Sequence, residues 1–121
     1  MCCLVCSGGS SIHLCICVFG IVLNIYMYLY VITDHDKELC KIGFSEDPDR
    51  RVAELNVGNP QRLLVEHRVR VPEERARALE RKLHFELGHC RVSGEWFRVP
   101  ARRAAGLLDF CVIRWLDDPL V

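Results

Sequence analysis

Residues 26–43 read YMYLYVITDHDKELCKIG, and this stretch decides the fold. Its first part, Tyr28–Ile32, is rich in aromatic and β-branched residues, which are typical of a strand. The polar residues Asp34–Glu38 follow as a turn, and Leu39–Gly43 is a second strand candidate. Two short apolar segments joined by a polar turn predict a β-hairpin.

A helix and a third strand are predicted after this hairpin. Asp47 is a helix N-cap residue followed by a proline at the first helical position, so we expect a helix that runs to about Leu55. Gln61–Val71 alternates weakly and predicts the third strand. In such a strand one face would carry Leu63, Val65, His67, Val69 and Val71.

Two more helices complete the charged part of the chain. Leucines at helical spacing predict a helix between Pro72 and Gly88, and the last helix should begin after Pro100. The residues between them, Val92–Val99, predict one short strand or a turn. We therefore expect an α+β fold, an α/β sandwich in which a small three-stranded antiparallel sheet is flanked by helices.

Charge is distributed unevenly along the 121 residues. The 16 Lys and Arg and the 16 Asp and Glu residues give zero formal net charge, and all of them follow Thr33. This balance excludes a histone-like polycation, and a hydrophobic content of 50% excludes a disordered chain. We divide the chain into an apolar, cysteine-rich extension (1–27), a domain (28–99) and a C-terminal helix (100–121).

The extension allows two interpretations. The run Leu14–Ile32 is apolar except for Gly20 and Asn24. A run of this length can cross a bilayer, so residues 12–27 are a candidate membrane segment. No Lys or Arg precedes this run, and its last residues are needed for the first strand, which leaves a short span. The alternative is an unstructured or mis-started leader. We expect a cytoplasmic protein, with membrane association as the open alternative.

Two groups of residues suited to phosphate binding lie near the hairpin. Tyr30 and Lys41 can be cross-strand neighbours in a hairpin, and Gly43 leaves room for a phosphate or another backbone to approach. Arg50 and Arg51, on the first helix, carry guanidinium groups that suit phosphate oxygens. Each group by itself is also typical of packing or of a solvated helix surface.

A third group lies on the second helix. Glu80 and His84 are four residues apart and share one helix face. Glu80 is a candidate ligand for a divalent cation that takes its other ligands from water and phosphate. Together the three groups fit phosphodiester hydrolysis with one metal ion, or, without the metal, a nucleic-acid-binding surface.

Six short motifs follow one another in a specific order. They are Tyr30-Val-Ile32, Lys41-Ile-Gly43-Phe-Ser45, Asp47-Pro48 followed by Arg51, Asn56-x-Gly-Asn-Pro60, Leu79-Glu80-x-x-Leu83-His84 and Gly94-Glu-Trp-Phe97. This order resembles the GIY-YIG endonuclease superfamily, and within it the bacteriophage Orf-172-like, or Mug-113-like, DNA-binding branch.

The resemblance implies DNA as the partner and a nuclease-like site. The implied catalytic residues are Tyr30, Lys41, Arg51, Glu80 and His84, with Glu80 binding a single Mg²⁺ or Mn²⁺ ion. Lys41 stands where the nucleases carry a tyrosine, so an endonuclease and a non-catalytic DNA-binding module, with or without a membrane tether, both remain open. The expected DNA contacts are Arg50, Arg51, Lys41, Arg81, Lys82, Arg91 and Trp96.

Overall fold

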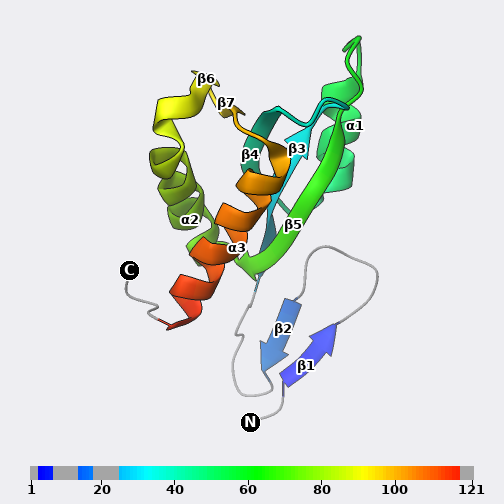
Figure 1. Ribbon diagram of the computed structural model, residues 1–121. Coiled ribbons are helices and arrows are strands. Elements are labelled where there is room, and N and C mark those ends of the chain that lie inside the picture. The colour runs from blue at the N-terminus through cyan, green and yellow to red at the C-terminus, as the bar shows by residue number, and fades with distance from the viewer. Residues whose placement is uncertain (1–2, 7–13, 18–24, 118–121) are drawn as a thin grey trace.

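The computed structural model describes residues 3–6, 14–17 and 25–117. The predicted hairpin is confirmed: β3 (Tyr26–Thr33) pairs antiparallel with β4 (Leu39–Ser45). The third predicted strand is also present, as β5 (Leu64–Pro72), which pairs antiparallel with the other edge of β3 (Figure 1).

The expectation of a three-stranded sheet is wrong, because the sheet has five strands in the order β5-β3-β4-β7-β6. The two additional strands, β6 (Arg91–Ser93) and β7 (Trp96–Arg98), form a short hairpin that joins the outer edge of β4. Gly94, in the turn between them, has a φ of 55°, a conformation that glycine adopts without strain. This tight turn lets both arms of the segment pair as strands.

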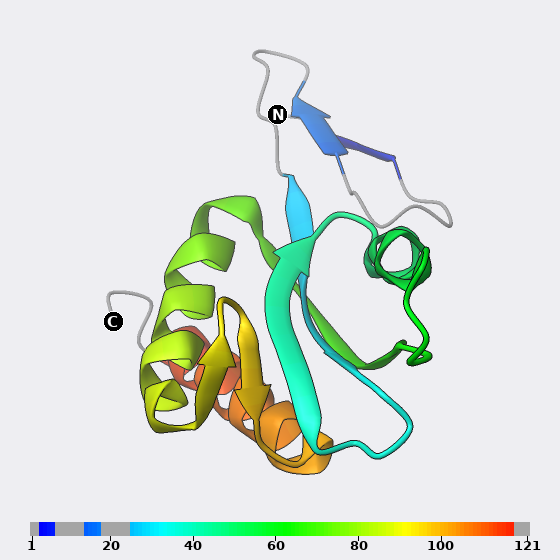
Figure 2. The same ribbon diagram turned by 90° about the horizontal axis from the view of Figure 1, so that it is seen from above.

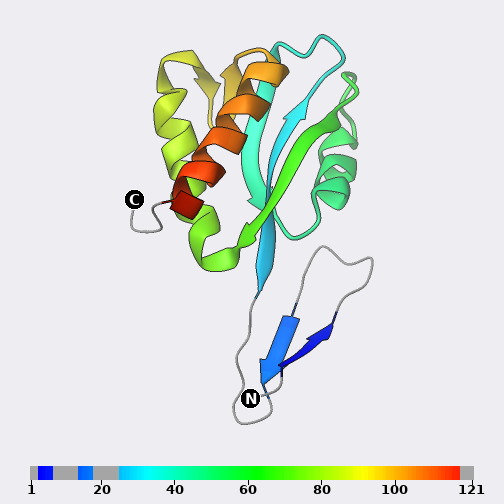
Figure 3. The same cartoon turned by 60° about the horizontal axis from the view of Figure 1, so that its bottom comes forward.

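All three predicted helices are present. They are α1 (Pro48–Asn56), α2 (Glu73–Glu86) and α3 (Ala101–Asp117), and a single 3₁₀ turn, η1 (Gly88–Cys90), follows α2. Figure 2 shows α1 on one face of the sheet, whereas α2 and α3 cover the other face. These two helices lie side by side there (Figure 3).

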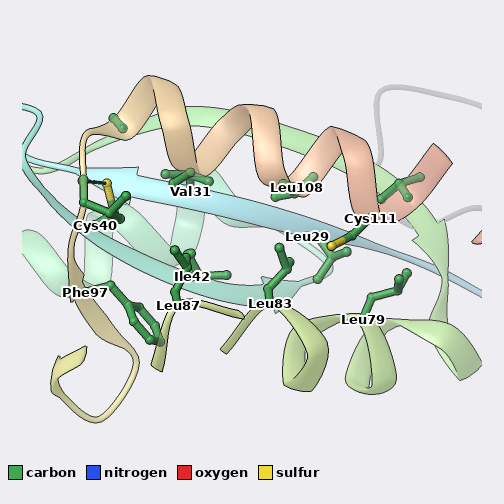
Figure 4. Close-up of a cluster of buried hydrophobic side chains, with 14 of the residues drawn as sticks. Leu29, Val31, Cys40, Ile42, Leu79, Leu83, Leu87, Phe97, Leu108 and Cys111 are labelled. Atoms are coloured by element: carbon green, nitrogen blue, oxygen red, sulfur yellow. Dashed lines mark hydrogen bonds between the residues drawn. The ribbon is translucent and has the colours of Figure 1, made fainter. Parts of the chain in front are cut away.

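The main hydrophobic core lies between the sheet and the pair α2 and α3 (Figure 4). Leu29 and Val31 of β3 point into it. Successive side chains of a strand point to opposite faces, so Tyr30 and Ile32 face α1 instead and belong to a smaller cluster there. We call the side of the sheet that carries α1 the α1 face.

The predicted alternation of the third strand breaks at a β-bulge. The register between β3 and β5 shifts by one residue at Glu66. Val69 and Val71, which follow the bulge, pack in the main core, whereas Leu63 and Val65, which precede it, pack on the α1 face. The prediction that these side chains share one face is therefore wrong, because the extra residue exchanges the two sides of the strand.

Parts of the N-terminal extension also form strands. β1 (Cys3–Cys6) and β2 (Leu14–Cys17) pair antiparallel in a separate two-stranded sheet. Among the described residues no helix is long and apolar enough to cross a membrane. Residues 12–13 and 18–24 of the candidate membrane segment, and residues 118–121 at the end of the expected C-terminal helix, lie outside the described residues.

Candidate functional site

The candidate site is centred on Gly43 of β4, where the α1 face of the sheet lacks a side chain. Tyr30 lies directly opposite Gly43 in the β3–β4 ladder. A Cβ atom added at Gly43 would lie 2.6 Å from the Tyr30 hydroxyl oxygen and 3.3 Å from Glu95 Oε1. The space that a side chain would take is therefore filled by the phenol and bordered by a carboxylate.

Lys41 points to the same face two residues before Gly43. Its Nζ donates a hydrogen bond of 2.5 Å to Glu95 Oε1, and its side chain is 9% exposed, against 42% for Glu95. Glu95 comes from the turn between β6 and β7, which brings it to β4. Glu95 lies in the Gly94-Glu-Trp-Phe97 motif, but it was not predicted as a site residue. The signal in the sequence is the place of Lys41 inside a strand, between Cys40 and Ile42, because an ammonium group that becomes buried there needs an anionic partner.

Removing the Glu95 carboxylate should destabilise the domain. The Glu95→Ala variant leaves the nearly buried Lys41 ammonium without its partner, and we expect a loss of about 1–3 kcal/mol in the free energy of unfolding by urea. A matched control is Glu46→Ala, which removes an exposed carboxylate 3.6 Å from Arg50 and should change stability by about 0.5 kcal/mol or less. Equal effects of the two variants would show that the Lys41–Glu95 pair contributes no more than a surface pair.

Helix α1 brings Arg51 to the Tyr30 hydroxyl. Burial raises the pKa of Tyr30, nearby Glu95 raises it further, and the hydrogen bond to Arg51 opposes this rise. The phenol therefore keeps its proton at neutral pH. For Arg51, burial lowers the pKa, but the hydrogen bonds to Tyr30 and Glu54 outweigh this effect and the pKa is raised.

Helix α2 brings Glu80 and His84 to the outer edge of β4. Within the described part of the chain, β7 pairs with β4 only as far as Lys41. Beyond that point His84 Nε2 lies 2.8 Å from the carbonyl oxygen of Ile42, which only accepts, so Nε2 carries the proton and donates it. The His84 ring also contacts Phe97, with centroids 5.1 Å apart. These contacts hold α2 against β4 and place Glu80, one turn earlier, beside the site.

The Glu80 carboxylate is partly buried and carries a perturbed pKa. Burial raises this pKa and the charge of Glu95 adds to the rise, whereas His84, Arg77 and Lys41 lower it. Glu80 forms no ion pair with any residue in the described range 25–117. A partly buried carboxylate without a direct ion pair, whose pKa stays raised despite more distant positive groups, is a position where a bound cation would compensate the charge.

The raised pKa of Glu80 predicts a pH-dependent cost in stability. The folded state binds the proton more tightly than the unfolded state, so ionisation of Glu80 lowers stability as the pH rises above its ordinary value of 4.5. Glu80→Gln cannot ionise. In thermal melts with EDTA present, we expect its melting temperature relative to wild type to be higher at pH 7.5 than at pH 4. A difference that does not change with pH would contradict the prediction.

The residues present fit a hard divalent cation. Among the described residues no group of three or more His, Cys, Asp or Glu side chains is placed to hold a metal ion. Mg²⁺ commonly binds through one or two carboxylates and takes water and phosphate oxygens as its remaining ligands. Glu80 supplies one such carboxylate. The carboxylate of Glu95 is close enough to raise the pKa of Glu80.

The structure places the other predicted DNA contacts in different surroundings. Arg50 and Arg81 are exposed on α1 and α2. Arg91 donates a hydrogen bond from Nη1 to the carbonyl of Gly94, so it supports the β6–β7 turn. Lys82 lines a hollow between α2 and α3 together with Glu86, Leu107, Phe110, Cys111 and Arg114. The structure therefore does not bring Lys82 to the site.

Two arginines of β5, which were not predicted as site residues, lie on one face of the strand, and one of them, Arg68, is the neighbour of Tyr30. Arg68 pairs with Tyr30 across the sheet, and its guanidinium makes two hydrogen bonds to the Asp49 carboxylate, at 2.7 and 3.1 Å. Arg70 lies 5.0 Å from the ring centroid of Tyr26. The signal in the sequence is the spacing of two, which puts both arginines on one face of a strand.

Comparison with known proteins places the chain in a family. No curated protein and no solved structure matches it significantly. The family model described as the T5orf172 domain matches residues 26–115, which is most of the chain and contains every residue of the candidate site. The chain therefore belongs to the T5orf172 domain family, whose members are phage-associated domains of nuclease or DNA-binding type.

Proposed function

We propose that this chain binds DNA and hydrolyses a phosphodiester bond with a divalent metal ion held by Glu80. The observation that carries the proposal is the convergence of groups from three other parts of the fold around the Tyr30 hydroxyl, which lies beside Gly43 and Glu95. The pKa of Tyr30 responds to Arg51 of α1, to Glu80 of α2 and to Glu95 of the β6–β7 turn. The six ordered motifs support the further assignment of the domain to the GIY-YIG superfamily.

Arg51 and Tyr30 are the groups that would contact the phosphate. The Arg51 side chain is 43% exposed, and its guanidinium can exchange its weak contact with Glu54, at 3.4 Å, for a non-bridging phosphate oxygen. The protonated Tyr30 phenol would donate a hydrogen bond to the attacking water or to a phosphate oxygen. Bound at Glu80, Mg²⁺ or Mn²⁺ would stabilise the negative charge that develops on the phosphate and the leaving oxygen.

Lys41 and His84 would act mainly by positioning other groups. Lys41 fixes the Glu95 carboxylate at the edge of the site, and its contact with that carboxylate makes it a poor candidate to accept a proton from water. His84 fixes α2 through its hydrogen bond to Ile42 and thereby orients Glu80. Both are therefore positioning residues in the proposed reaction.

A non-catalytic DNA-binding module is the second candidate function. The observation that favours it is Lys41, which occupies the place of a second phenol and is already paired with Glu95. A site without that phenol would retain the phosphate contacts of Arg51 and lack one of the polar groups for activating water.

Incubation of supercoiled plasmid with the full-length chain separates the two functions. Conversion to the nicked circle in Mg²⁺ or Mn²⁺, and none in EDTA, is the expected result for the endonuclease. DNA binding in a gel-shift assay without nicking in any metal would favour the non-catalytic module. Absence of salt-dependent DNA binding would rule out both functions, because phosphate contacts dominate the affinity of either one.

A further inference from the structure

A hollow of about 320 Å³ lies on the α1 face beside the candidate site. Its volume is at the lower end of the range of about 300–1,000 Å³ that is typical of small-ligand pockets. Apolar and polar side chains line it in equal number, and they are Leu39, Leu63, Val92, Trp96, Asp34, Asn59, Gln61 and Ser93. Glu80, Arg51 and Tyr30 are not among them, so the hollow is separate from the candidate site.

We propose that this hollow binds a single unpaired base of the DNA strand whose phosphate lies at the candidate site. The inference rests on the proposed function and adds a substrate class to it, namely DNA with a base outside the stack. Such a base needs an aromatic or apolar surface for its ring and a few polar groups for its edge. The lining of the hollow supplies both.

Trp96 joins the hollow to the candidate site. It pairs with Lys41 across the β4–β7 ladder. Lys41 donates a hydrogen bond to the Glu95 carboxylate, which lies beside Gly43. The same Trp96 packs on the cluster that contains Tyr30. Trp96 therefore lies between the hollow and the residues around Tyr30, where a strand would pass if its phosphate occupied the site and its base the hollow.

The polar groups of the hollow suit the edge of a base better than a phosphate. Asp34 is a carboxylate, which repels phosphate and can accept hydrogen bonds from the amino groups of adenine, cytosine or guanine. Its Oδ1 accepts the backbone N–H groups of Asp36 and Lys37, both at 3.1 Å, which fixes its orientation. Within the described part of the chain, the side-chain amide of Gln61 has no hydrogen-bond partner and remains available to a ligand.

The loop that carries Asn59 and Gln61 is fixed in advance of binding. Asn56, at the end of α1, makes two hydrogen bonds to the backbone of Leu63, at 2.8 Å to its N–H and 3.0 Å to its carbonyl. Asn59 Oδ1 accepts the Gln61 N–H at 2.9 Å, which leaves the amide N–H groups of Asn59 free to donate. Groups that are ordered before binding cost less entropy when the ligand binds.

Trp96 fluorescence offers a direct test. The chain has two tryptophans, so Trp115→Phe leaves Trp96 as the only reporter. The ligands are three DNA duplexes that are identical except for the centre: one fully paired, one with a single bulged adenine, and one with an abasic residue in place of that adenine. EDTA prevents cleavage. We expect the bulged adenine to bind about tenfold tighter than the abasic bulge and to quench Trp96, because base–aromatic stacking has about this strength.

Variants of the hollow extend the test. Gln61→Leu keeps the size of an exposed side chain and removes its amide, so it should reduce the preference for the bulged adenine. Trp96→Ala removes the aromatic surface and should abolish this preference. Equal binding of the three duplexes without a difference in quenching would overturn the base-binding proposal and leave the proposed function standing. If none of the duplexes binds, the proposed function fails and this proposal fails with it.

Discussion

Replacing Glu80 by glutamine is expected to reduce metal-dependent nicking at least about 100-fold while DNA binding in EDTA stays within about twofold of wild type. Glutamine preserves the size of the side chain and removes the charge that would hold the cation. Arg51→Ala should cause a loss of similar size, since it removes a guanidinium from the phosphate, and should also weaken DNA binding. Rates of plasmid nicking and gel-shift affinities measured at one fixed salt concentration separate these two effects.

The chain offers matched controls away from the site. Glu86 lines the hollow between α2 and α3, and Arg102 is exposed on α3, on the other side of the sheet from α1. Glu86→Gln and Arg102→Ala should therefore change nicking by no more than a few fold. Wild-type nicking by Glu80→Gln would exclude Glu80 as the metal ligand, and loss of nicking in both controls would indicate general damage to the domain instead of a specific site.

The elements that the sequence predicts correctly depend on local signals. The β3–β4 hairpin follows from two apolar segments around a polar turn, and α1 from Asp47, whose side chain accepts the backbone N–H of Arg50 at 3.1 Å. The β6–β7 hairpin has only three residues in each strand, and pairing with β4 stabilises it. The bulge at Glu66 likewise depends on how β5 pairs with β3, so the sequence of β5 alone does not predict it.

The same distinction applies to the site. Tyr30, Arg51 and Glu80 could be named because each occupies a place in an ordered motif. The Lys41–Glu95 pair spans 54 positions in the sequence and exists only because β7 lies next to β4. Lys82 is predicted only as a candidate for a local basic surface, and its place on the helix decides its surroundings: it follows Glu80 by two helical steps of about 100° each and lines the hollow between α2 and α3.

Gly43 is the position where the smallest change should have the largest specific effect. An alanine Cβ there would lie 2.6 Å from the Tyr30 hydroxyl oxygen and 2.9 Å from its Cζ, which is closer than such atoms approach. Both atoms belong to the Tyr30 side chain and not to the backbone, but this ring is only 2% exposed and must shift within its cluster to admit the alanine. The domain should remain folded at a cost in stability while the phenol leaves its position beside Arg51 and Glu95.

We therefore expect Gly43→Ala to reduce nicking about 100-fold, because small displacements of a reacting group have effects of that order. Its free energy of unfolding should fall by about 1–3 kcal/mol, the usual cost of added volume in a packed site, partly offset because alanine lowers the entropy of the unfolded chain. Gly106→Ala is the matched control: a Cβ at Gly106 meets no atom within 4 Å, so the variant should nick normally and be slightly more stable. Normal nicking by Gly43→Ala would mean that the Tyr30 hydroxyl does not need its present position, and Tyr30 would then lose its place in the proposed site.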